Sequence, residues 1–299
     1  MKREIMTAGA LALVLCWGWS DAPAQRWALK GYDNIGVGRP MRLETPQAGQ
    51  SSGSSYNQFG LDLGYTFWRR GAQSLEANVG VGYSYATASL RLADTDYSYA
   101  APSSADMDGN EYIRHCSVKG LEQKAGIQSV TVPVYLEYQW RPLRWLGIHA
   151  EAGVGLSFAV RSGLGSVRGS VDSYGVFPEY DDLVIDADYL DDFGEVYLHR
   201  ATPGSMRVQK FGASVLCGAG LEFYTYAPVS FEVGVRYNAG LTQVFDGRYD
   251  VRTAAEYTAE TAPVIYTVDG GTQVRSLTDY TTKSRLSPLS IRVGINVRF

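Results

Sequence analysis

The 299-residue chain lacks any run of about 20 consecutive apolar residues, which is the length that a membrane-crossing helix requires. Its apolar stretch 8–17 is too short for this purpose and lies close to the N-terminus. Hydropathy alone therefore indicates a soluble exported protein. Strands that cross a membrane escape this test, because apolar and polar side chains alternate along them.

The chain also lacks an excess of charge of one sign. Its 27 Lys and Arg face 31 Asp and Glu, and no basic stripe is present. We therefore expect no nucleic-acid partner. Instead, the composition is rich in tyrosine and glycine, with 21 and 33 residues, which suits twisted sheets better than helices.

Cysteine is scarce, with three residues in all. Cys16 lies in the N-terminal leader, where it could end a lipobox, but the preceding Leu15 is bulkier than such motifs favour. Cys116 falls in a long polar segment and Cys217 lies in the middle of an apolar strand face. We expect both to be free thiols, and a disulfide between them is the alternative.

The N-terminus has the three parts of a secretory signal. Lys2 and Arg3 supply positive charge, the apolar stretch follows, and residues 22–24 have the small-x-small form of a cleavage site. We predict cleavage after Ala24. This divides the chain into a signal peptide, residues 1–24, and one outer-membrane barrel domain, residues 25–299.

Segments with alternating apolar and polar residues recur along the rest of the chain. Seven are strong and span nine or more residues, which is the length of a tilted membrane strand. They are 59–67, 75–85, 130–140, 146–158, 211–223, 231–241 and 289–299. An eighth segment, 27–38, alternates more weakly, because Asp33 falls on its apolar phase.

The connections between these segments are of two kinds. Three are short (68–74, 141–145, 224–230) and three are long and polar (92–127, 160–208, 242–287). In outer-membrane barrels, short turns face the periplasm and long loops face outward. This rule requires the weak strand at 27–38, which makes the strand number even. The sequence thus predicts an all-β fold: an eight-stranded antiparallel up-and-down transmembrane β-barrel with long extracellular loops.

One long connection contains a further signal. Asp269-Gly270-Gly271, flanked by alternating β-formers, predicts a hairpin over 264–277. We therefore expect the barrel wall to extend beyond the membrane.

Side-chain size indicates which phase of the strands faces the lumen. Nearly all strand glycines share a phase with charged residues, and an eight-stranded lumen is narrow enough to need such a mixture. The larger members of this predicted lumen network are Glu76, Glu137, His149, Glu151, Glu222, Glu232, Arg236 and Arg292. The opposite phase is predicted to face lipid at Val81, Val134, Val154, Val215 and Val235.

Counting through the short turns predicts contacts within the lumen. His149 is expected opposite Glu137 as a histidine–carboxylate pair. Glu222 is expected opposite Glu232, with at least one of the two arginines bridging them, because two close carboxylates repel. Such ion pairs would plug the lumen.

Tryptophan supports the same topology. Four residues fall at the predicted periplasmic strand ends, as in an interfacial aromatic girdle: Trp27, Trp68, Trp140 and Trp145. The alternative interpretation is that these four tryptophans are core residues at random positions.

The last strand provides the most specific motif. Arg292, Gly294, Val297 and the terminal Phe299 have the polar-x-Gly-x-x-apolar-x-aromatic form, which resembles the C-terminal assembly signal of outer-membrane barrels.

Residues 25–299 as a whole resemble small outer-membrane barrels of the OmpA-transmembrane-domain or OmpX type. The resemblance implies an outer-membrane location, with outer-membrane lipid, lipopolysaccharide and the barrel-assembly machinery as partners. Unlike full-length OmpA-like proteins, no periplasmic peptidoglycan-binding domain follows Phe299, so we expect no cell-wall tether.

Candidate catalytic and metal-binding residues are few. No phosphate loop, nucleophile elbow, zinc spacing or cofactor motif is present, so we expect no cofactor. The loop histidines His115 and His199 form no catalytic set, although His199 follows several acids. Residues 179–195 contain eight carboxylates that could hold Ca²⁺, but a solvated acidic loop is favoured.

We therefore expect a non-enzymatic outer-membrane protein that supports envelope integrity or makes surface contacts through its loops. The alternatives are a gated path for small hydrophobic molecules, an enzyme acting on lipid A, and an accessory subunit of a secretion or uptake complex.

Overall fold

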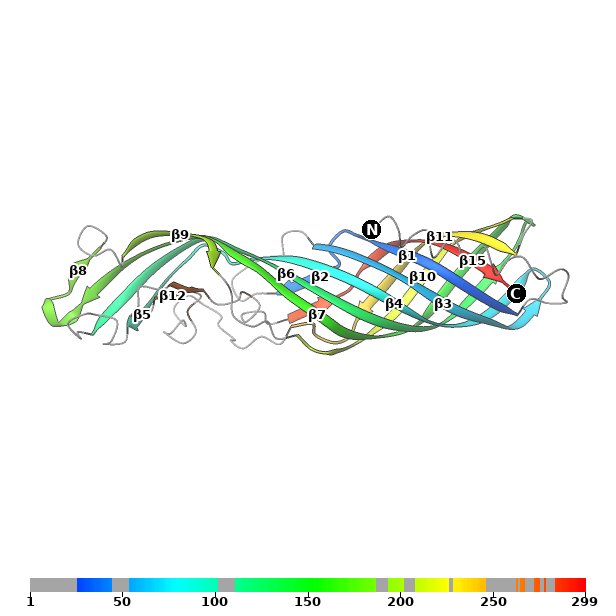
Figure 1. Cartoon of the computed structure of the whole chain (residues 1–299), viewed down its shortest axis with the longest axis horizontal. Coiled ribbons are helices and arrows are strands. Elements are labelled where there is room, and N and C mark those ends of the chain that lie inside the picture. The colour runs from blue at the N-terminus through cyan, green and yellow to red at the C-terminus, as the bar shows by residue number, and fades with distance from the viewer. Residues whose placement is uncertain are drawn as a thin grey trace.

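A computed structural model shows the fold of the chain (Figure 1). It describes residues 26–44, 54–101, 111–186, 193–201, 208–225, 228–245, 262, 264–266, 272–274, 277 and 283–299. The predicted signal peptide and its cleavage site lie outside these residues. No helix among the described residues is long and apolar enough to cross a membrane.

Eight antiparallel strands form a closed ring, as predicted. In order around the ring they are β1 (Trp27–Val37), β3 (Ser54–Arg70), β4 (Gln73–Arg91), β6 (Tyr112–Trp140), β7 (Leu146–Phe177), β10 (Phe211–Tyr224), β11 (Val229–Gly240) and β15 (Leu289–Arg298). Pairing of β15 with β1 closes the ring, so the weakly alternating first strand does belong to the wall. Closure leaves this part of the sheet without an exposed edge.

The strands are strongly staggered. The row of paired residues that starts at Trp27 passes around all eight strands and returns to β1 at Val37, ten residues further along. This shift requires the strands to tilt relative to the barrel axis, because stagger and tilt are linked in a closed barrel. Every second residue faces a narrow lumen.

Two strands continue far beyond the ring. β6 has 29 residues and β7 has 32, and their hairpin carries β5 (Thr95–Ala101), β8 (Leu183–Ile185) and β9 (Gly194–Ala201) on its edges. Figure 1 shows this extension continuing from one end of the barrel along the long axis of the molecule. The long connections 92–127 and 160–208 therefore consist largely of paired strands, which extend the wall beyond the ring.

Three shorter pieces complete the described structure. β2 (Met41–Glu44) pairs with β14 (Lys283–Leu286), and together they follow directly from the paired strands β1 and β15. β12 (Val264–Tyr266) pairs with β13 (Thr272–Val274), which confirms the predicted hairpin. A 3₁₀ turn, η2 (Pro178–Tyr180), lies between β7 and β8.

The two faces of the wall differ in chemistry as predicted. The side chains of Val81, Val134, Val154, Val215 and Val235 are 45–53% exposed on the outer face. The four tryptophans of the predicted girdle are also exposed, at the end with the short turns: Trp27, Trp68, Trp140 and Trp145.

The extension has the opposite arrangement. Its interior is an apolar core that includes Leu90, Tyr97, Val118, Leu121 and Val171, all buried. This core continues into the mouth of the barrel, where Met41 of β2 packs into it. Polar residues of the same strands lie on the outer face.

Candidate functional site

All eight residues of the predicted lumen network lie buried inside the ring. Their exposed fractions range from 1 to 5%, and they come from β4, β6, β7, β10, β11 and β15. Among the described residues, the interior contains four strong cations and six carboxylates in mutual contact. They are Lys30, Arg236, Arg292 and Arg298, with Asp62, Glu76, Glu137, Glu151, Glu222 and Glu232.

Lys30 of β1 occupies the centre of one cluster. Its Nζ lies 2.5 Å from Glu76 Oε1 and 2.8 Å from Glu137 Oε2. The lysine is fully buried. Since β4 and β6 place the two glutamates directly opposite each other, the lysine provides the positive charge that lets both remain close together.

A second cluster surrounds the arginines. Arg236 makes a two-pronged contact with Glu151, with Nε and one terminal nitrogen 2.5 and 2.6 Å from the carboxylate oxygens. Arg292 lies 3.1 Å from Asp62 Oδ2 and 2.7 Å from Glu232 Oε1. The bidentate contact of Arg236 with Glu151 fixes both the position and the orientation of the guanidinium group.

The predicted pairing of Glu222 with Glu232 is correct, but the predicted arginine bridge is wrong. Arg292 contacts Glu232, whereas Glu222 is bound by Arg298 at 2.6 and 3.0 Å. Asn296 connects the two carboxylates instead, since its amide nitrogen lies 3.1 Å from Glu222 and 3.5 Å from Glu232.

The predicted partner of His149 also needs correction. His149 lies opposite Gln139, not Glu137, and its Nε2 is 3.4 Å from Glu232 Oε1. The first two residues of β7, Leu146 and Gly147, pair with β10 alone. The β6–β7 pairing therefore begins two residues later than a count through the turn suggests.

Three charged members of the network were missed from the sequence: Lys30, Asp62 and Arg298. Each has the phase of known lumen residues, since Asp62 alternates with the strand glycines Gly60 and Gly64. The same alternation places Arg298 in phase with Arg292. A systematic reading of strand phase would have found all three.

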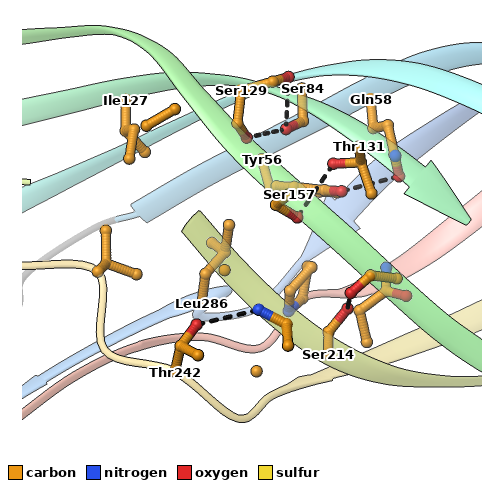
Figure 2. A pocket seen from close by; sticks show the side chains of 18 of the residues that line it. Tyr56, Gln58, Ser84, Ile127, Ser129, Thr131, Ser157, Ser214, Thr242 and Leu286 are labelled. Carbon is orange, nitrogen blue, oxygen red and sulfur yellow. Dashed lines mark hydrogen bonds between the residues drawn. The ribbon is translucent and has the colours of Figure 1, made fainter. Parts of the chain in front are cut away.

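A cavity lies between this network and the apolar core of the extension. It encloses about 790 Å³ including its open part. Six serine and threonine side chains line it, and Figure 2 shows two hydrogen-bonded pairs among them. Ser84 and Ser129 are 2.7 Å apart, and Thr131 and Ser157 are 3.2 Å apart. The other two are Ser214 and Thr242.

The ends of the cavity differ in chemistry. Arg236 lines it on the side of the ion-pair network, whereas Ile127 and Leu286 line it on the side of the extension. Phe211 also contributes to the lining, although its side chain is exposed on the outer apolar face. The cavity is therefore suited to a small amphipathic molecule or to water.

The far end of the extension carries a second candidate site, on its outer face. Ile113, Tyr174 and Val184 have exposed fractions of 38–53%, and we call this group the tip face. The backbone pairs of β6, β7 and β8 bring these residues together. His115 stacks on Tyr174, with 4.8 Å between ring centroids.

The tip face rests on a small apolar core of its own. Tyr112 stacks on Phe177 at 4.9 Å, and Phe193 meets the edge of Tyr112 at 5.9 Å. Arg114 lies over the Phe193 ring at 4.6 Å. The tip face is therefore held on a packed support.

The predicted catalytic and metal candidates do not assemble into a site within the described residues. No group of three or more His, Cys, Asp or Glu side chains there is arranged to hold a metal ion. The acidic segment 179–195 is described only in part, because residues 187–192 lie outside the described set, and so does the side chain of His199.

The last strand has the following arrangement. Arg292 and Gly294 belong to the inward phase, and Val297 faces outward. Phe299 exchanges backbone hydrogen bonds with Trp27 at 2.9 and 3.1 Å, so the terminal aromatic residue lies beside one tryptophan of the girdle. Both free thiols are as expected: Cys116 is buried and Cys217 is exposed.

Comparison with known proteins gives one family. The family described as "Outer membrane protein beta-barrel domain" matches residues 33–246, which is more than half of the chain. No curated protein matches the chain.

Two solved structures show weak likeness. The translocator domain of the autotransporter NalP from Neisseria meningitidis is 11% identical, with coverage of 99% of this chain and 96% of that chain and a TM-score of 0.24. A FadL homologue from Pseudomonas aeruginosa is 10% identical, with coverage of 92% and 89% and a TM-score of 0.16.

Proposed function

Because the chain belongs to the outer membrane protein β-barrel domain family, and hence to the bacterial outer membrane, we propose that it is a non-enzymatic surface protein whose extension contacts a protein partner. The observation that carries this proposal is the tip face. Its aromatic and aliphatic side chains are exposed at the end of the extension, far from the apolar band of the barrel. Lipid cannot cover them there, and contiguous exposed apolar groups are typical of protein interaction sites.

The lumen supports a role that does not depend on transport. Crossed ion pairs from all sides of an eight-stranded ring leave little room for a water path. Its histidine, His149, is paired with a glutamate and lies within this network. These contacts support a structural plug over a catalytic centre.

Photo-crosslinking in intact cells tests the proposed contact. We expect a reactive residue placed at Tyr174 to form protein adducts, because this position belongs to the tip face. A matched residue at Ser166, which is exposed on the same strand outside the tip face, should form few. The changes Ile113→Ser and Val184→Ser together should remove the adducts while barrel insertion and heat-modifiable gel mobility stay unchanged. Equal adduct patterns at both positions would contradict the proposal.

A second candidate function is a gated path for small hydrophobic molecules. The cavity favours it, since Phe211 of the outer apolar face and Ser214 of the inner face both line it. Uptake of a fluorescent hydrophobic probe into vesicles that contain the barrel would test this path. Narrowing the cavity with Ser214→Trp should slow uptake, whereas the outward change Val215→Trp should not.

A further inference from the structure

A hollow lies on the outer face of the wall, where the ring passes into the extension. It is lined by β3, β4, β6 and β7 and encloses about 1650 Å³, including space open to solvent. We call it the outer groove. It is separate from the internal cavity, because the two share no lining residue.

Small residues and strand irregularities produce the groove. Gly126 and Gly163 are paired across β6 and β7, and a side chain at Gly163 would meet nothing within 4 Å. The β6–β7 register shifts at Gln128/Ser129 and again at Gln123/Ala125. Such bulges bend and twist a strand, which here curves the sheet around the glycines.

The groove begins where the outer apolar band ends. The row Tyr83, Val130 and Phe158 is still apolar on the outer face. In the next outward-facing row, Tyr85 lies opposite Gln128, and Gln128 lies opposite Arg161. A lipid whose acyl chains lie on the band therefore has its headgroup at the level of the groove.

Two cations line the groove. Lys124 and Arg161 are exposed, and among the described residues neither makes an ion pair. Glu122 is the acidic residue of the lining, and its carboxylate accepts a hydrogen bond from Ser89. Arg161 lies opposite Gln128, and Lys124 lies four residues from Gln128 on β6, towards the extension. The two cations are therefore separated by about 13 Å along the strand direction.

Neutral hydrogen-bonding groups fill the remaining wall. Ser55 and Thr87 hydroxyls lie 2.5 Å apart, and the Gln128 side chain accepts a hydrogen bond from Tyr83 at 2.7 Å. Hydroxyl and amide groups suit sugar hydroxyls, whereas the two separated cations suit two separated anions.

We propose that the outer groove binds the headgroup of a bisphosphorylated glycolipid of the outer leaflet, of the lipid A type. Arg161, next to the apolar band, contacts one phosphate, and Lys124 contacts the phosphate at the other end of the disaccharide. The polar wall between them contacts the sugar rings. A singly charged phospholipid headgroup engages one of the two cations and is held less tightly.

The test uses the full chain folded in detergent micelles, with lipid binding measured by native mass spectrometry. The probes are bisphosphoryl lipid A, monophosphoryl lipid A and phosphatidylglycerol. We expect bisphosphoryl lipid A to bind about tenfold more tightly than either of the others, which corresponds to about 1.4 kcal/mol, because each of the others lacks one charge-assisted contact.

Variants locate the contact. Lys124→Gln with Arg161→Gln should weaken binding of bisphosphoryl lipid A by about tenfold or more and remove the preference over the other lipids. Lys119→Gln with Arg168→Gln removes the same charges from exposed positions of the same two strands, outside the groove lining. This control should retain the preference. Equal loss in both double variants, or equal affinity of the unaltered chain for all three lipids, would overturn the proposal.

Discussion

The barrel and its extension are built from the same strands with opposite chemistry. Within the barrel, inward residues of β4 such as Glu76 and Asn78 are polar and buried, whereas Val79 and Val81 are exposed. Further along the same strand, Leu90 is buried in an apolar core and Arg91 is exposed. The point at which the polarity reverses marks the outer boundary of the lipid-covered surface.

This reversal shows that the solvent around each region, rather than strand geometry, determines which phase is apolar. Lipid covers the outside of the barrel, so apolar side chains are stable there and polar ones face the lumen. Water surrounds the extension, so burial of apolar groups between its strands is favourable, as in soluble proteins. Four predictions test or refine this comparison, in order of decreasing expected effect.

The largest effect is expected from the polar interior of the barrel. Arg236→Met leaves Glu151 buried without its cation, which should lower the free energy of unfolding by about 3–5 kcal/mol. The double change Arg236→Met with Glu151→Met should cost much less, because no unpaired charge remains. Urea titration of the folded fraction in lipid vesicles measures both. A double variant as unstable as the single one would argue against ion pairing as the cause.

The apolar interior of the extension should respond to loss of volume. Leu90→Ala should destabilise the extension by about 2–5 kcal/mol, because the side chain is buried in its core. Val81→Ala on the lipid face of the same strand should cost less, since lipid can fill the space. Protease cleavage of the extension on intact cells measures the first effect. Equal sensitivity of the two variants would contradict the comparison.

Charge on the outer face should be tolerated according to depth. Val134→Arg should cost about 2–4 kcal/mol, because this residue lies in the apolar band. Gln128→Arg, on the same face of β6 but in the first row beyond the apolar band, should cost about 0–1 kcal/mol. The yield of folded barrel in vesicles of graded thickness would show both. Similar costs for the two variants would show that the boundary of the lipid-covered surface does not lie between these two residues.

The smallest effect concerns the two thiols. Burial raises the pKa of the Cys116 thiol to about 11, so its reactive thiolate is scarce at neutral pH. Cys217 is exposed on the barrel wall. A lipophilic maleimide at pH 7 should therefore label Cys217 and leave Cys116 unmodified until the protein is denatured. The change Cys217→Ser should abolish labelling of the folded protein, and labelling that persists would place Cys116 at an accessible surface.

Seven strands of the ring could be predicted because their alternation is uninterrupted. The eighth strand, β1, also keeps one phase towards lipid, although Asp33 interrupts its apolar pattern. Asn57 donates a hydrogen bond to the Asp33 carboxylate at 3.1 Å. Chain topology, rather than local pattern, identified that strand.

The strands of the extension were not predicted because bulges disrupt their alternation. On β6, Val118 and Leu121 are both buried although they are three residues apart, and the β6–β7 register shifts between Lys119 and Glu122. A period of two cannot continue through such a shift. Polar residues on the outer face also gave these segments the composition of loops.

The lumen network was found in part for a related reason. Strand phase places a residue inside, which is sufficient to identify Glu151 or Arg236. Partners additionally require the register across each turn, and the β6–β7 turn shifted this register by two residues for His149. Within a narrow lumen, side chains also reach across to strands that are not neighbours, as Lys30 of β1 does to Glu137 of β6.

Closure of the ring by β1 and β15 determines how the barrel can fold. These strands pair along their full length although about 260 residues of chain separate them, from Trp27 to Leu289. Such distant pairing makes contact order high and folding slow. The wall cannot close while β15 is still being synthesised or exported, so the chain must be kept unfolded in transit and protected from aggregation until its last strand arrives.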